Sequence, residues 1–100
     1  MRYTIGPSAR RDLEEIWDYI AGDNVEAADR VLEQLAEKFD LLAIHKLIGR
    51  QENRFGRGVR ALPYNAYLIF YLSDREPIEI VRVIHSARDI PTLMENDLMN

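Results

Sequence analysis

The sequence predicts an α+β domain in which an N-terminal strand and an antiparallel two-helix hairpin pack on a mostly antiparallel sheet of three to four strands. Two helical stripes of apolar residues precede residue 45, and apolar runs with strand character follow residue 58. With 100 residues, the chain suffices for one domain, residues 1–100, and is too short for two.

The first elements are a short strand and two helices. Residues 2–5 alternate like a strand and stop at Gly6-Pro7, because proline removes a ladder donor. Ser8 is the predicted N-cap of a first helix that ends at Gly22, and Asp23 or Asn24 caps a second helix. Apolar residues recur every three or four positions, at Ala9, Leu13, Ile16, Trp17 and Ile20, and again at Ala28, Val31, Leu32, Leu35, Phe39 and Leu42. The short connection predicts an antiparallel hairpin.

The second half of the chain reads as strands. A loop after Ala43 leads to an expected edge strand near residues 53–55, and a further strand at residues 59–62 is ended by Pro63. Asn65 lies near a turn, residues 67–72 form a nearly continuous apolar strand, and residues 74–77 connect it to a largely buried strand at residues 78–84. A short terminal helix is expected around Thr92, Leu93 and Met94.

Charge and composition exclude several classes of function. The net charge of −4 disfavours generic nucleic-acid binding, which depends on a basic excess. Residues 46–60 are the exception, with five basic residues against Glu52 and a local charge of +4; these are Lys46, Arg50, Arg54, Arg57 and Arg60. The absence of cysteine removes disulfides, thiolate metal sites and cysteine nucleophiles. Because no long apolar run is present, we expect a cytoplasmic protein without a membrane span.

Two arginines lie among apolar neighbours on predicted strands. A guanidinium cannot be deprotonated in a protein, so it must be paired or reach solvent. Arg60 is expected either to pair with a carboxylate such as Asp89 or to bind a phosphate or an acidic partner. Arg82 is expected to share a face with Ile80 and Ile84, opposite Val81 and Val83, and to be either buried with a partner or part of a site.

The order and spacing of several segments resemble the ParE toxins of the RelE/ParE superfamily, over nearly the whole chain. Residues 9, 12–13 and 16–20 carry the resemblance on the first helix, and residues 27–28, 35 and 39 carry it on the second. Further on, it rests on Gly49-Arg50, on residues 59–63 and 67–71, and on residues 80–89. The resemblance implies the RelE/ParE-like fold and the toxin half of a bacterial type II toxin-antitoxin pair.

In the ParE branch the resemblance implies a toxin that blocks DNA gyrase without cutting nucleic acid. It also implies a ParD-like antitoxin as partner, a hetero-oligomeric complex, and contact with operator DNA only through the antitoxin. The RelE branch implies a ribosome-dependent mRNA endonuclease instead. Two departures count against that alternative, because the only lysines are Lys38 and Lys46 and no tyrosine follows His85. A family member that retains only antitoxin binding is the third possibility.

The candidate residues follow from these alternatives. A nuclease would use Arg60, His85 and Arg88, with His85 as the base that deprotonates a ribose 2′-hydroxyl. If the protein is not a nuclease, His85 is expected to be a hydrogen-bonded structural residue. Trp17, Tyr19 and Phe39 are expected in the core, with part of the hairpin face open to the antitoxin. Two isolated histidines and scattered carboxylates predict no metal site, and no cofactor is expected. Candidates for antitoxin or target binding are Trp17, Arg50, Arg54, Arg57, Arg60, Arg82 and Arg88.

Overall fold

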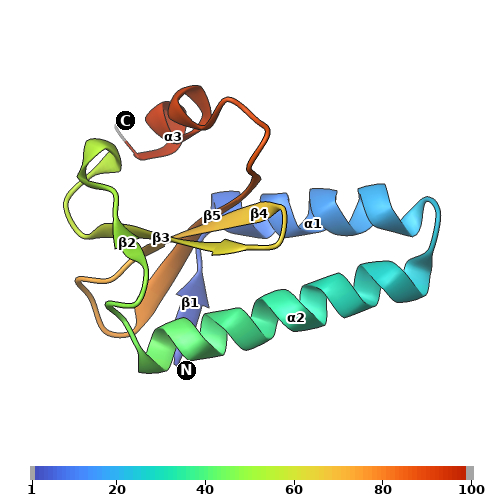
Figure 1. Ribbon diagram of the computed structural model, residues 1–100, viewed down its shortest axis with the longest axis horizontal. Coiled ribbons are helices and arrows are strands. Elements are labelled where there is room, and N and C mark those ends of the chain that lie inside the picture. The colour runs from blue at the N-terminus through green and yellow to red at the C-terminus, as the bar shows by residue number, and fades with distance from the viewer. Residues whose placement is uncertain (1, 99–100) are drawn as a thin grey trace.

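The computed structural model describes residues 2–98, and it describes side chains as far as Met94. Figure 1 shows two long helices on one side of a twisted sheet and a short C-terminal helix on the other. The elements are β1 (Tyr3–Ile5), α1 (Pro7–Ala21), α2 (Val25–Ile44), β2 (Arg50–Gln51), the 3-10 helix η1 (Asn53–Phe55), β3 (Val59–Tyr64), β4 (Tyr67–Leu72), β5 (Ile78–His85) and α3 (Ile90–Leu98). The predicted α+β class is confirmed. No helix in residues 2–98 is long and apolar enough to cross a membrane.

The sheet has five strands in the order β1-β5-β4-β3-β2. β1 pairs with β5 in parallel, and the other pairs are antiparallel. β2 therefore forms one edge, and it pairs with β3 only at Arg50 and Gln51. At the other edge, β1 covers β5 only along its first half, at residues 78–80.

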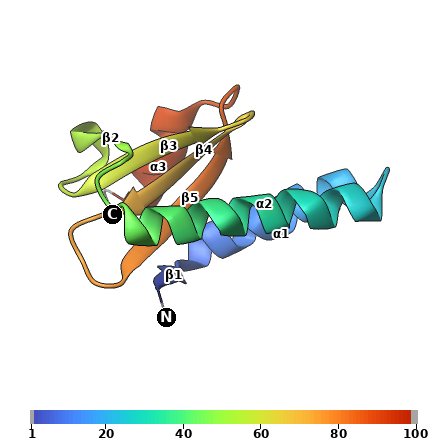
Figure 2. The same ribbon diagram turned by 60° about the horizontal axis from the view of Figure 1, so that its bottom comes forward.

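The helical hairpin forms as predicted, with one shift at its start. α1 begins at Pro7, with Gly6 rather than Ser8 as N-cap, because a proline at the first helical position gives up only a donor that the helix leaves unbonded. Asn24 caps α2, and its Oδ1 accepts the N–H of Ala27 at 3.0 Å. In Figures 1 and 2 the end of the hairpin where α1 is joined to α2 extends beyond the sheet.

Apolar side chains fill both faces of the sheet. Under α1 and α2 the buried cluster consists of Ala9, Leu35, Phe39, Leu42, Ile69, Tyr71, Ile78, Ile80 and Val83. On the opposite face α3 covers a second cluster of Phe55, Val59, Ala61, Phe70, Val81, Ile84 and Met94. Strand side chains alternate between faces, so β4 and β5 supply residues to both clusters.

Two predictions at the β2 edge were wrong. Residues 53–55 are the 3-10 helix η1 rather than an edge strand, and the strand pairing lies at Arg50 and Gln51 instead. Pro63 does not end β3, which continues to Tyr64. β2 pairs with β3 only at Ala61 and Arg60, so Pro63 lies where that edge is uncovered and a missing donor costs little.

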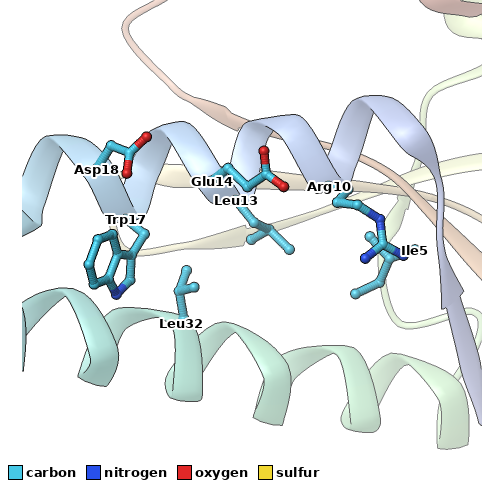
Figure 3. A pocket seen from close by; sticks show the side chains of 7 residues that line it. All are labelled: Ile5, Arg10, Leu13, Glu14, Trp17, Asp18 and Leu32. Atoms are coloured by element: carbon cyan, nitrogen blue, oxygen red, sulfur yellow. The ribbon is translucent and has the colours of Figure 1, made fainter.

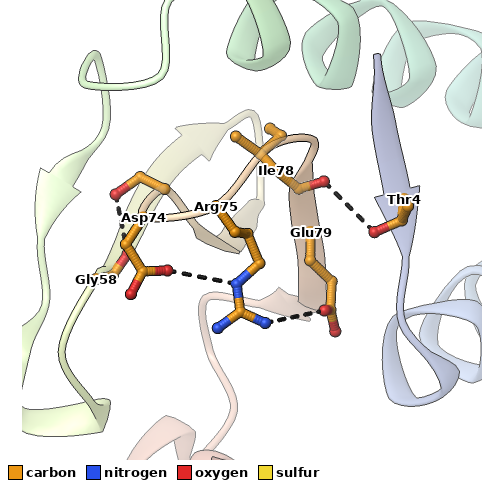
Figure 4. A network of polar contacts seen from close by, with 7 residues as sticks. Thr4, Gly58, Asp74, Arg75, Ile78 and Glu79 are labelled. Atoms are coloured by element: carbon orange, nitrogen blue, oxygen red, sulfur yellow. Dashed lines mark hydrogen bonds and ion pairs between the residues drawn. The ribbon is translucent and has the colours of Figure 1, made fainter. Parts of the chain in front are cut away.

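The connections between β3, β4 and β5 are tied by local polar contacts. Asn65 has a φ of 50° in the β3–β4 turn, as expected of a turn residue that tolerates the left-handed region. In the β4–β5 connection, Figure 4 shows Arg75 between Asp74 and Glu79, each contact being 3.4 Å. The same view shows Thr4 Oγ1 donating to the carbonyl of Ile78, which links β1 to β5.

Candidate functional site

The structure divides the predicted site residues among four places. Arg50, Arg54, Arg57 and Arg60 lie at or near the β2 edge, and His85 and Arg88 lie at the end of β5. Arg82 is buried in the interior of β5, and Trp17 lies on α1 in the helical hairpin. These positions define one exposed surface, one buried ion pair and two crevices.

Arg60 holds the turn that joins α2 to β2. Its Nη1 donates to the carbonyls of Leu47 at 3.2 Å and Gly49 at 2.8 Å. The expected pairing with Asp89 is wrong, because Asp89 instead accepts the hydroxyl of Thr92 at the start of α3. Arg60 therefore fixes the backbone of this turn.

Tyr71 fixes the same turn from inside the sheet. Its buried hydroxyl accepts the N–H of Gly49 at 2.9 Å and donates to the carbonyl of Lys46 at 2.8 Å. Burial raises the pKa of the Tyr71 phenol above its ordinary value, against the lowering effects of the Gly49 N–H and of Arg60. A Cβ at position 49 would lie 2.6 Å from the hydroxyl oxygen, so only glycine permits this approach.

The fixed turn presents apolar side chains to solvent. Five large apolar residues are exposed among the residues whose side chains are described, and three of them fall within residues 44–48. These are Ile44, Leu47 and Ile48, with exposed fractions of 60%, 68% and 51%. Two shallow depressions meet at Ile48, one running toward Leu41 on α2 and the other toward Leu62, Pro63 and Leu68 on the sheet. The apolar area is therefore continuous across the turn.

Arginines border this apolar area. Arg50 and Arg54 both approach Glu52, at 3.1 and 3.3 Å, and Arg54 also stacks over the ring of Phe55. Arg57 is exposed in the turn before β3. Arg50 and Arg54 thus share one carboxylate, and with Arg57 nearby the positive charge is in excess. We call this set the edge surface; it consists of Ile44, Leu47, Ile48, Arg50, Arg54 and Arg57. Lys46 is outside it because it pairs with Glu76.

Arg82 forms a buried ion pair with Asp12 of α1. The two side chains are 8% and 7% exposed, and the guanidinium contacts both carboxylate oxygens, Nε at 2.7 Å and Nη2 at 2.9 Å. Asp12 also accepts the N–H of Val83 at 2.8 Å, where β1 no longer covers β5. Arg82 Nη1 donates to the carbonyl of Leu93 on α3. This pair therefore connects α1, the open part of the β5 edge and α3.

The facing predicted for β5 is confirmed for Val83 and Ile84 and is wrong for Ile80 and Val81, which exchange faces. A register shift opposite Phe70 and Tyr71 changes the alternation, so that Tyr71 pairs with Ile80 and Phe70 with Arg82. Ile80 and Val83 consequently lie under the helices, whereas Val81 and Ile84 lie under α3. Sequence reasoning also gave no structural role to Asp12. An acidic residue within an apolar helical stripe, here between Ala9 and Leu13, was the sign that it would be buried and paired.

His85 and Arg88 come together in a crevice between α1 and the end of β5, which Tyr19 and Tyr67 also line. His85 Nδ1 accepts the N–H of Ala87 at 3.1 Å, and its ring meets that of Tyr67 edge to face. Arg60 is not in this crevice. Along β4, Arg60 pairs with Tyr71 and His85 with Tyr67, so about 13 Å of strand separates them. The three residues of the nuclease hypothesis are therefore not assembled.

Trp17 lies in a crevice between α1 and α2. Figure 3 shows Trp17 and Leu13 facing Leu32, with Glu14 and Asp18 on the other side of α1. The indole N–H donates to Asp29 at 2.8 Å, and the ring is half-buried. Tyr19 is 86% exposed rather than in the core, whereas Phe39 is buried as predicted.

No group of three or more histidine or acidic side chains that could hold a metal ion occurs in the described part of the chain.

Comparison with known proteins places these features in a family. A profile described as "ParE toxin of type II toxin-antitoxin system, parDE" matches residues 3–90. Toxin ParE1 of Mycobacterium tuberculosis (strain CDC 1551 / Oshkosh) is 33% identical over 91 residues, covering 89% of this chain and 93% of the relative. Toxin RelE3 of Caulobacter vibrioides is 28% identical, covering 82% and 90%. The fold is similar to a solved chromosomal ParDE TA system from P. aeruginosa, with a TM-score of 0.70, 22% identity, and 85% and 95% of the two chains covered.

Proposed function

The chain belongs to the ParE toxin family of type II toxin-antitoxin systems, and we propose that it inhibits DNA gyrase in the cytoplasm by binding and is neutralised by a ParD-like antitoxin. The gyrase target comes from the resemblance to the ParE branch. The assignment of an antitoxin as partner is supported by the structural similarity to a chromosomal ParDE system.

The observation that best supports a function through protein–protein contacts is the edge surface. Exposed aliphatic side chains usually occur singly, and a cluster beside charged groups is typical of interaction sites. Here the cluster is on a turn whose carbonyls at Lys46, Leu47 and Gly49 are bonded to Tyr71 and Arg60. The turn is therefore ordered before any partner binds, which lowers the entropy lost on association.

The positions of the basic and titratable side chains favour binding over RNA cleavage. General base catalysis requires the base and the charge-stabilising groups to surround one reacting phosphate. His85 and Arg88 are near each other, but Arg60 is at the opposite end of β4 and is bonded to carbonyls. Contact with operator DNA is assigned to the antitoxin, because the toxin carries a net charge of −4.

Purified gyrase provides the test of target and mechanism together. We expect the toxin to increase the amount of cleaved plasmid recovered after gyrase is denatured and digested in the presence of ATP. His85→Ala should retain this effect, since its side chain is not needed for binding in the proposal. A chain that leaves gyrase cleavage unchanged, or that loses its effect on growth together with RNA cleavage when His85 is removed, contradicts the proposal.

A further inference from the structure

We propose that the crevice between α1 and the end of β5 binds a small zwitterion with a flat side chain, of the class of the free aromatic amino acids. We call it the β5 crevice; its lining includes Glu15, Ile16, Tyr19, Tyr67, His85 and Arg88. The inference goes beyond the proposed function, because it assigns a small-molecule ligand to residues that take no part in the edge surface.

The course of α1 along β5 forms the crevice. Asp12 accepts the N–H of Val83 in the interior of β5, and Tyr19, two turns further along α1, lies near Tyr67 at the end of the β4–β5 pair. Because β1 pairs with β5 only at residues 78–80, the rest of that strand edge faces α1 directly. The volume of the crevice is about 360 Å³. Small-molecule sites begin at about 300 Å³, so the space suits a ligand of amino-acid size.

Three rings and an aliphatic side chain form the apolar part of the crevice. The rings of Tyr67 and His85 meet edge to face, with their centroids 5.7 Å apart. Burial raises the pKa of the Tyr67 phenol, and the nearby Tyr19 phenol raises it further, so the two tyrosine side chains lie close together. Ile16 adds an aliphatic side chain from α1. Rings pack well against further rings in edge-to-face or offset geometry, so this part favours a flat aromatic group.

One unbalanced charge of each sign lies at the crevice. Arg88 and Glu15 are both exposed, and neither side chain forms an ion pair within the part of the chain whose side chains are described. Asp12 also lines the crevice, but its charge is already balanced by Arg82. A guanidinium and a carboxylate are therefore available to a ligand beside the rings.

These two charges specify the head group of the ligand. Arg88 can hold a carboxylate, and His85 adds a second donor, because its Nδ1 accepts the N–H of Ala87 and the neutral ring therefore carries its proton on Nε2. Glu15 can hold an ammonium. A simple anion would meet the like charge of Glu15, and a simple cation would meet that of Arg88, so a ligand with both charges is favoured over either. An amino acid carries both groups on one carbon, next to its side chain.

The test uses isotope-labelled full-length toxin and four small probes. Phenylalanine has both charges, 3-phenylpropionate lacks the ammonium, phenethylamine lacks the carboxylate, and N-acetylphenylalanine amide keeps the ring but has neither charge. We expect phenylalanine to shift the amide resonances of Tyr19, Tyr67 and His85. In low salt its affinity should exceed that of each single-charge probe by about three- to fivefold, and the uncharged probe should bind most weakly.

Variants at the two charged residues separate their contributions. Arg88→Gln should remove the advantage of phenylalanine over phenethylamine, whereas Glu15→Gln should remove its advantage over 3-phenylpropionate. Both side chains are exposed, so neither change is expected to disturb the fold. Arg57→Gln and Glu37→Gln are the matched controls, since they remove exposed charges outside the crevice and should leave all four affinities unchanged.

Three results would overturn the inference: no resonance shifts at the crevice with phenylalanine, equal affinity for phenylalanine and a single-charge probe, or tighter binding of N-acetylphenylalanine amide. The last result would show that the crevice takes a side chain within a polypeptide rather than a free amino acid. Failure here is distinguishable from failure of the proposed function. A toxin that poisons gyrase but does not bind phenylalanine refutes the crevice site alone, whereas one that binds phenylalanine but leaves gyrase unaffected refutes the gyrase target alone.

Discussion

Replacing Asp12 with alanine should destabilise the fold strongly. The variant leaves the Arg82 guanidinium in a site where its side chain is only 8% exposed, and it also removes the acceptor of the Val83 N–H. Removing one partner of a buried ion pair typically costs about 3–5 kcal/mol. A domain of this size is stable by about 5–15 kcal/mol, so the loss is a large share of the total.

Urea denaturation followed by circular dichroism measures this cost. Arg50→Gln is the matched control, because it breaks an exposed ion pair with Glu52 and should change stability by less than about 1 kcal/mol. The double variant Asp12→Leu with Arg82→Met should recover most of the loss, since replacing both members of a buried pair with apolar residues is often neutral. A loss below about 1 kcal/mol in Asp12→Ala would refute the reasoning.

Three further outcomes follow from other contacts. Tyr71→Phe should cost about 1–3 kcal/mol and speed amide exchange at Gly49, because the Gly49 N–H and the Lys46 carbonyl lose their partner; unchanged exchange at Gly49 would contradict this. Since burial raises the pKa of Tyr71, the folded state keeps its phenol proton at pH values where the unfolded chain has lost it. Stability should therefore fall as the pH rises past about 10, less so in Tyr71→Phe, and a pH profile identical in the two proteins would argue against it. Met94→Ala should cost about 2 kcal/mol in urea titrations, because Met94 is fully buried between α3 and the sheet; a neutral result would mean that α3 does not pack there in solution.

Much of the fold could be predicted because its signals are periodic or carried by single residues. Strand β4 has the predicted bounds, since a run of apolar residues between turn signals specifies a buried strand on its own. Asn24 caps α2 as one of two predicted candidates, because side-chain capping is a local interaction. The family resemblance, which is carried by many such segments in order, is likewise confirmed.

The features that escaped prediction depend on contacts between distant segments. A two-residue strand such as β2 has no periodicity, and its pairing with β3 is visible only in three dimensions. The register shift in β5 reverses the facing of two residues without any sign in the sequence. The buried pair of Asp12 and Arg82 joins positions 70 residues apart. Exposure of Leu47 and Ile48 depends on Tyr71 and Arg60, which hold the turn from another part of the chain.

The roles of the candidate residues remain predictions, but the structure changes what each can do. Arg60 and Arg82 both have structural partners, so substituting either one would disturb the turn or the core as well as any site. Arg50, Arg54 and Arg57 are better positions for testing partner contacts, because their side chains are exposed. Trp17 and Arg88 line crevices of their own and can be tested independently of the edge surface.

Inducing the toxin in a bacterial host without an antitoxin tests the central claim most directly. Incorporation of labelled thymidine and of labelled methionine would be followed in parallel over the first minutes. Gyrase inhibition predicts that thymidine incorporation falls first and that His85→Ala behaves like the natural chain. A fall in methionine incorporation that precedes any loss of DNA synthesis and disappears in His85→Ala would contradict the account.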